Sequence, residues 1–154
     1  MAANRLFHYL DEHGIKYVTT SHSPAFTAAE VAVSAHVATR SFAKTVVIKV
    51  DDVPAMLVLP ANRRILIHEL REMLENENVK LATERELQEC FPDCEVGAMP
   101  PLGPLYGVKV HVSAGLTREH DITFNAGSHT ETITMAYADF ERLVHPAVID
   151  LVTA

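Results

Sequence analysis

One lysine stands at the mouth of a predicted strand, where its charge is available for chemistry. Lys44 is followed by Thr45 and then by the apolar residues 46–48, so its ammonium is expected to be partly desolvated. If that ammonium faces a cleft, it can hold a phosphate or a carbonyl oxygen as a point charge, and desolvation strengthens the contact. The alternative is an ordinary solvated lysine at the end of a strand.

A second candidate is the segment 96–107, VGAMPPLGPLYG, in which glycine and proline are concentrated. Pro100 and Pro101 restrict the backbone, whereas Gly97 and Gly103 permit dihedral angles and close approaches that a side chain would prevent. Such a loop is preorganised to bring backbone N–H and C=O groups against a small polar ligand, without an acid or a base from a side chain. A rigid surface turn without a ligand is the alternative.

A third candidate is the tight turn at residues 125–129, NAGSH, between two predicted strands. The turn displays the hydroxyl of Ser128 and the imidazole of His129. Because an imidazole titrates near neutral pH, His129 is a candidate for orienting or relaying a proton. A histidine in a turn is more often simply exposed to solvent, so this reading depends on what surrounds the ring.

The sequence lacks the patterns of several common catalytic machineries. It has no Gly-x-Ser-x-Gly nucleophile motif, and neither Cys90 nor Cys94 has a basic or histidine neighbour. Its glycines do not form a phosphate-binding motif that opens a helix. No pair of its nine histidines has the spacing of a metal site, so neither a metal nor a cofactor is expected. A metal-dependent hydrolase built on His111, His120 and His129 remains the alternative.

Composition bounds the class of protein. The chain has 154 residues, of which 48% are hydrophobic and 21% charged, as in one globular domain with a sizeable core. The longest apolar run, residues 53–60, is too short to span a bilayer, and the N-terminal segment lacks the features of a signal peptide. These features predict a cytoplasmic protein without membrane contact. With a net charge of −7, the protein would need a local basic patch to bind nucleic acid.

The elements that must position these candidates follow from periodicity, from turn residues, and from capping boxes that begin at Thr27 and at Thr83. Helices are expected over residues 4–13, 27–39, 68–74, 84–91 and 137–144, and strands over 16–22, 44–50, 55–59, 79–82, 107–113, 121–125 and 130–135. The two strands around residues 51–54 are expected to form an antiparallel hairpin. The order predicts a single α+β domain over residues 1–154, with a mixed, mainly antiparallel, barrel-like sheet surrounded by helices.

Taken together and in this order, the three candidate segments resemble the YbaK and prolyl-tRNA synthetase-associated editing domains, which are aminoacyl-tRNA deacylases. The matching stretches are FAKTVV at 42–47, GAMPPLG at 97–103 and FNAGSH at 124–129, followed by ITM at 133–135 and DF at 139–140. The similarity runs over nearly the whole chain, from about Arg5 to Leu143. Each stretch is short, but three in the right order and at the right separations are fairly specific.

The resemblance implies a metal-free enzyme that hydrolyses the ester joining a wrong amino acid to the 3′ acceptor end of a tRNA, with water as the nucleophile. Within it, Lys44 would hold the terminal nucleotide or the ester, and the loop would fix the aminoacyl group through backbone atoms. The catalytic residues it implies are Lys44, Gly103 and His129. The substrate-binding residues it implies are Thr45, Gly97, Pro100, Pro101, Leu102, Gly127 and Ser128. An aminoacyl-tRNA synthetase is a further expected partner.

An aminoacyl ester is already activated, so positioned water and stabilisation of the oxyanion would suffice without a catalytic triad or a zinc ion. The tight proline-bounded loop favours a small mischarged residue: alanine, serine, threonine or cysteine. The chain departs from YbaK itself, because it has no aromatic residue in the segment 19–22. Its Gly-Ser-His turn resembles the synthetase-inserted and alanine-editing branches instead, and tRNA-Pro is one candidate substrate.

A protein of this net charge is expected to approach tRNA through a localised basic face. The candidate cations are Arg40, Lys44, Lys49, Arg63, Arg64 and Arg71. The alternative to an enzyme is a catalytically silent paralogue that binds an aminoacyl or nucleotide group, or docks on a synthetase, through the same cleft.

Overall fold

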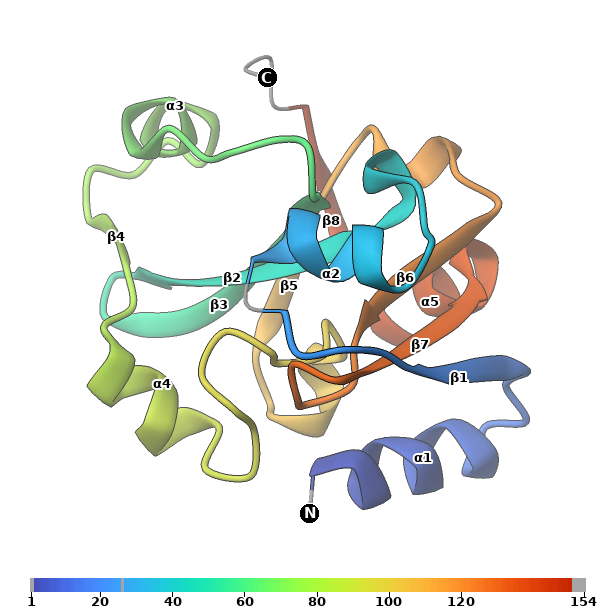
Figure 1. Cartoon of the computed structure of the whole chain (residues 1–154). Coiled ribbons are helices and arrows are strands. Elements are labelled where there is room, and N and C mark those ends of the chain that lie inside the picture. Colours follow the sequence, from blue (N-terminus) through green and yellow to red (C-terminus); the bar gives the residue numbers. More distant parts are fainter. Residues whose placement is uncertain (1, 26, 151–154) are drawn as a thin grey trace.

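Two β-sheets form the centre of the molecule, with the helices around them (Figure 1). The structure is a computed structural model that describes residues 2–25 and 27–150. Its helices are α1 (Ala2–Glu12), α2 (Ala28–Ser34), α3 (Ile67–Met73), α4 (Glu84–Cys90) and α5 (Tyr137–Val144), with short 3₁₀ turns η1 (Thr39–Ser41), η2 (Gly103–Leu105) and η3 (Leu116–Arg118). In these described ranges, no helix is both long enough and apolar enough to cross a membrane.

The strands fall into two sheets. They are β1 (Tyr17–Ser21), β2 (Ala43–Val50), β3 (Val53–Pro60), β4 (Val79–Leu81), β5 (Lys109–Ser113), β6 (Asp121–Asn125), β7 (Glu131–Ala136) and β8 (Ala147–Ile149). One sheet has the order β4-β2-β3-β5-β8, and the other has the order β1-β7-β6. β3 pairs with β5, and β5 with β8, in parallel, whereas every other pair is antiparallel.

The expected α+β class and the mainly antiparallel pairing are confirmed, but the barrel is not. Among the described residues, the two sheets are joined by one isolated parallel bridge, between Phe42 and Thr123. β1 ends one sheet and β8 ends the other, and these edge strands do not pair with each other. The sheets therefore stay open.

Side chains alternate along β2, so its two faces pack in different parts of the core. Ala43 and Val47 point to the main core, which also contains Phe124 and Ile133 from the smaller sheet. Ile48, on the opposite face of β2, packs in a second cluster with Leu57, Leu59 and Leu70, beneath α3. Phe42 belongs to a third, smaller cluster with Val31 of α2. Lys44, two residues after Phe42, is therefore on the face turned away from the main core.

The β2–β3 hairpin forms as predicted. Its ladder runs without interruption from Ala43↔Pro60 to Val50↔Val53. Asp51 and Asp52, between the strands, both have positive φ, 51° and 65°, as a two-residue type I′ turn requires. This ladder fixes the side of the sheet on which each β2 residue lies.

The second predicted helix is shorter than expected. Thr27 and Glu30 form the predicted capping box at its start, but α2 ends at Ser34 and not at residue 39. His36 takes a left-handed conformation with φ 58°, and the amide of Val37 donates to the carbonyl of Ala32 at 2.8 Å. This Schellman arrangement satisfies the last carbonyls and turns the chain toward η1.

Candidate functional site

The glycine-proline loop and the Gly-Ser-His turn, which are distant in sequence, are joined by hydrogen bonds. The Gly127 amide donates to the Ala98 carbonyl at 3.0 Å, and the Glu95 amide donates to the Gly127 carbonyl at 2.9 Å. The His129 amide donates to Glu95 Oε2 at 3.1 Å, and His129 Nε2 donates to the Val96 carbonyl at 2.8 Å. We call residues 95–102 and 125–129, joined in this way, the cradle.

The residue types of the cradle account for its shape. Gly127 is buried and has φ 96°, a left-handed conformation that strongly favours glycine. Gly97 lies against the imidazole, since a Cβ placed on it would be 3.7 Å from His129 Cε1. Pro100 and Pro101 are buried, so the middle of the loop is anchored in the protein interior. Ser128 is half-buried, and its hydroxyl lies 3.3 Å from that of Thr130.

Gly103 and Leu102 have packing roles that explain their identity. A Cβ on Gly103 would lie 2.4 Å from the Val108 carbonyl oxygen and 2.4 Å from a methyl group of Val110. The Gly103 carbonyl accepts from the amides of Tyr106 and Val108. Leu102 is fully buried in the main core. Close packing against β5 thus requires a glycine at residue 103, whereas a catalytic role for Gly103 stays a prediction.

The positive charge of Lys44 is not compensated by any residue in the ranges that the structure describes. Its ammonium makes no hydrogen bond and no ion pair with any residue that the structure describes. The side chain is half-buried opposite Leu59 of β3, and this burial lowers the pKa of Lys44 below its usual value of 10.5. A desolvated cation without a partner is a binding site for an anionic or strongly polar oxygen.

Asn125 belongs both to the cradle and to β6, the strand that meets β2. β2 and β6 are in contact, and the isolated parallel bridge between Phe42 and Thr123 lies where they meet. Two residues on from the bridge, Lys44 and Asn125 lie on the same face, and Asn125 is also the first residue of the 125–129 turn. Asn125 Oδ1 is buried without a hydrogen-bond partner among the described residues. Asn125 belongs to the FNAGSH stretch of the sequence, but it was not predicted as a site residue.

The face that Asn125 shares with its neighbours is polar and buried. Thr132, opposite Asn125 on β7, is fully buried, and Thr123 is 2% exposed. The hydroxyls of Thr123 and Thr134 lie 2.7 Å apart. The chain between β1 and α2 lies beside this region, because the Ala25 amide donates to the His129 carbonyl at 3.3 Å. Hydroxyl and amide groups on a buried face are typical of a site for a polar ligand.

Thr45 lies on the other face of β2 from Lys44. Its Oγ1 points toward the main core and is buried without a partner among the described residues. Its backbone groups point to the same side of β2 as the Val47 carbonyl, which accepts from the Ala82 amide. β4 pairs only with residues 48–50 of β2 and does not reach Thr45. The predicted contact of Thr45 with a substrate would therefore come from its backbone.

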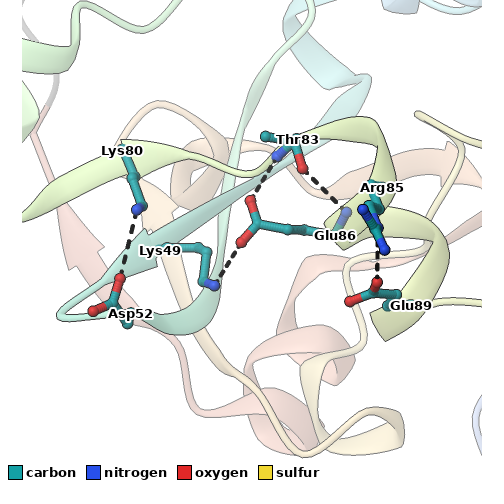
Figure 2. Close-up of polar contacts among 7 residues, drawn as sticks. All are labelled: Lys49, Asp52, Lys80, Thr83, Arg85, Glu86 and Glu89. Atoms are coloured by element: carbon teal, nitrogen blue, oxygen red, sulfur yellow. Dashed lines mark hydrogen bonds and ion pairs between the residues drawn. The ribbon is translucent and has the colours of Figure 1, made fainter.

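Two of the six cations expected to form a basic face lie elsewhere, which corrects that expectation. Lys49 projects toward α4 and pairs with Glu86, as Figure 2 shows. Lys80 pairs with Asp52 in the same region. Arg71 donates from Nε to the Val79 carbonyl at 3.0 Å. The sequence alone does not show which cations have an acidic partner close in space and which have none.

The histidines of the metal alternative do not assemble. His120 has a side chain 93% exposed beside Asp121, whereas His111 is buried in β5, where burial and the nearby Lys109 lower its pKa. His129 belongs to the cradle. In the described part of the chain, no three His, Cys, Asp or Glu side chains are grouped as metal ligands.

Comparisons with known proteins bear on the family and on the fold. A model of the aminoacyl-tRNA editing domain family matches residues 22–143, and a comparison with curated proteins gave no match. A structure of hypothetical protein APE2540 is 19% identical, with a TM-score of 0.83, over 95% of this chain and 97% of that one. A "putative trans-editing enzyme for prolyl tRNA synthetase" is 19% identical, with a TM-score of 0.80, over 97% and 96%.

A third similar structure comes from work on "epitope backbone grafting by computational design", with 16% identity and a TM-score of 0.81 over 97% of this chain and 96% of that one. At these identities the structures establish the fold alone. The family match covers most of the chain and includes Lys44, the loop and the Gly-Ser-His turn. The chain belongs to the aminoacyl-tRNA editing domain family.

Proposed function

We propose that this protein is a deacylase that hydrolyses the ester between a wrong amino acid and the 3′ end of a tRNA in the cytoplasm. The observation that carries the proposal is the uncompensated ammonium of Lys44 beside a cradle of fixed backbone groups. Such a pair of features suits a substrate with an anionic or polar 3′ end and a small uncharged ester group. The family match supports the same class of reaction.

The chain's groups have separate roles in this proposal. Lys44 binds the terminal nucleotide or the ester carbonyl, where a desolvated cation also stabilises the developing oxyanion. Backbone groups of residues 97–101 fix the aminoacyl group, and residues 127–129 line its pocket. Water adds to the carbonyl carbon, the ester C–O bond breaks, and the ribose hydroxyl leaves with a proton. The ester is activated, so the proposal needs neither a metal nor a covalent nucleophile.

The buried prolines of the cradle favour a small amino acid: alanine, serine, threonine or cysteine. A pocket separates residues that differ by one methylene by only about 1–3 kcal/mol, so an editing enzyme works as a second filter after a synthetase. tRNA-Pro is our first candidate substrate, and the similar trans-editing structure supports testing it. A synthetase that charges this tRNA is the corresponding candidate partner.

Release of labelled amino acid from a matrix of mischarged tRNAs tests the proposal, with wild type and Lys44→Ala run in parallel. We expect wild type to release a small residue, and Lys44→Ala to lose turnover while keeping its circular dichroism spectrum. Preferential release of a large aromatic residue would refute the small pocket. Binding of charged tRNA without any turnover would identify a silent paralogue, and loss of activity with a chelator would identify a metal enzyme.

A further inference from the structure

Three segments from separate parts of the chain pack together next to the start of β2. The Ala61 amide lies 2.9 Å from the Phe42 carbonyl and 3.1 Å from the Thr39 carbonyl, and donates to both. A Cβ on Gly115 would contact Pro60 at 3.8 Å. Residues 39–42, 60–64 and 115–119 therefore form one surface region, which we call the basic corner.

The basic corner has a charge opposite to that of the whole molecule. Its three segments contain four arginines and one acid, Glu119, so they carry a net charge of +3, whereas the whole chain carries −7. The arginines are Arg40, Arg63, Arg64 and Arg118. Glu119 accepts a hydrogen bond from the Ser41 hydroxyl at 2.7 Å, and its side chain is only 20% exposed. Solvent therefore meets mainly the cations.

Ion pairing separates these arginines from the others in the chain. Each arginine outside the basic corner has a partner: Arg5 with Asp93, Arg71 with the Val79 carbonyl, Arg85 with Glu89 and Arg142 with Asp139. In the basic corner, Arg63, Arg64 and Arg118 have no hydrogen bond or ion pair with a described residue through their side chains. Arg40 Nε lies 3.7 Å from Glu119 Oε1, with its side chain 72% exposed. An overall acidic protein thus leaves guanidinium groups unpaired in one place.

The basic corner adjoins the proposed site. Lys44 is paired with Leu59, which directly precedes Pro60 of the basic corner. Phe42, two residues before Lys44, accepts the hydrogen bond from Ala61. A nucleotide chain that ends at Lys44 would therefore have a route for its preceding phosphates over the arginines.

We propose that the basic corner binds the backbone phosphates of the RNA acceptor end whose 3′ ester lies at Lys44. This inference rests on the proposed function for the position of the ester. Arginine forks bind phosphate oxygens in a bidentate manner, and an unpaired guanidinium need not break an ion pair first. Phosphate contacts are independent of sequence, so the basic corner supplies affinity and leaves the identity of the tRNA to other contacts.

The test compares Arg63→Ala/Arg64→Ala, and separately Arg118→Ala, with the control Arg85→Ala on α4, which removes an arginine that is 88% exposed and paired with Glu89. Two measurements are made. One is the dissociation constant of uncharged tRNA over a series of salt concentrations. The other is kcat/KM for mischarged tRNA relative to the same amino acid esterified to adenosine, which lacks the preceding phosphates.

We expect the double variant to weaken tRNA binding about tenfold and to flatten the salt dependence by about 0.7–0.9 in log–log slope per lost contact. Its kcat/KM should fall more for tRNA than for the adenosine ester. Arg85→Ala should change neither binding nor this ratio. Equal effects of the control and the test variants, or an unchanged tRNA affinity in the double variant, would overturn the inference.

Two further outcomes separate this inference from the proposed function and from general binding of acidic chains. If no substrate is hydrolysed, the proposed function fails, while the tRNA binding measurements still decide the role of the basic corner. If poly-glutamate competes as well as RNA at equal charge concentration, the surface recognises acidic chains in general. The RNA inference is then wrong.

Discussion

The imidazole of His129 donates from Nε2 to the backbone carbonyl of Val96, at 2.8 Å. A carbonyl oxygen can only accept a hydrogen bond, so this contact fixes the proton on Nε2. The ring thereby fastens the 125–129 turn to the glycine-proline loop. His129 acts on the site first of all by holding backbone groups in place.

His129→Ala is therefore expected to lower both stability and activity. Loss of the hydrogen bond costs about 1 kcal/mol in the free energy of unfolding, and a looser cradle should reduce kcat/KM about 10- to 100-fold. His129→Gln, whose amide N–H also donates, should recover part of both losses. Urea denaturation and deacylation assays check this. Full activity of the alanine variant would show that the cradle does not depend on the ring.

Lys44→Met is expected to abolish deacylation and yet to raise the melting temperature. The folded pKa of Lys44 is lowered by burial, so the folded chain holds this proton less firmly than the unfolded chain. Stability then rises as pH increases from the folded pKa toward the unfolded one, and below that interval the buried charge is a cost. Calorimetry at neutral pH compares the variant with Lys16→Met, an exposed lysine. A lower melting temperature for Lys44→Met would contradict the conclusion that the charge of Lys44 destabilises the fold.

Asn125 is expected to be a positioning residue beside Lys44. Because its Oδ1 is buried without a described partner, Asn125→Leu should leave stability nearly unchanged while lowering kcat/KM about tenfold. Asn125→Asp should lower it further, since the new carboxylate would compete with the substrate for the Lys44 ammonium. Deacylation assays establish the order. The role fails if Asn125→Leu is as active as wild type and Asn125→Asp equals it.

Substitution of the loop glycines should separate the stability cost of a steric clash from the cost of a left-handed backbone conformation. Gly103→Ala forces a Cβ to within 2.4 Å of the Val108 oxygen and of a Val110 methyl group, and should cost about 3 kcal/mol of stability. Gly107→Ala meets no atom within 4 Å but must keep φ 67°, at about 1 kcal/mol. Chemical denaturation measures both. Equal costs would mean that the close approach at Gly103 is relieved by movement of β5.

Acid should selectively weaken the pairing between β2 and α4. Lys49 and the Thr83 amide hold the pKa of Glu86 at about 2, against an ordinary 4.5. The depressed pKa contributes stability above pH 4.5, which is lost as pH falls through 2. Glu86→Gln keeps the capping-box geometry and should be less stable than wild type at pH 6, with the difference vanishing near pH 2. Glu89→Gln, in an exposed pair, is the control. A difference that persists at pH 2 would exclude the ion pair as its cause.

Local rules predicted the parts of the fold that depend on neighbouring residues. The hairpin around Asp51 and Asp52 and the capping boxes at Thr27 and Thr83 were confirmed. β8 was missed because three residues after a helix carry too little periodicity, and its pairing with β5 is decided by tertiary packing. The barrel-like shape was not confirmed, because the pattern of a single strand does not determine which edge strands pair.

The candidate site was predictable only in part, for a related reason. The loop and the turn could be identified from glycine, proline and histidine, and the structure joins them directly. Asn125 could not be singled out, because its importance comes from the register of β6 beside β2. Lys49 was included wrongly, because its partner Glu86 is 37 residues away in sequence.

The bridge between Phe42 and Thr123 is the place where the two sheets meet beside the proposed site. Lys44 belongs to one sheet, and the 125–129 turn of the cradle joins two strands of the other, so their separation depends on how the sheets meet at this bridge. Substitutions around Phe42, which packs against α2, would change this separation and leave Lys44 and the turn themselves unaltered. Under the proposed function, the size of the amino acid that is accepted would then depend on packing remote from the reacting groups.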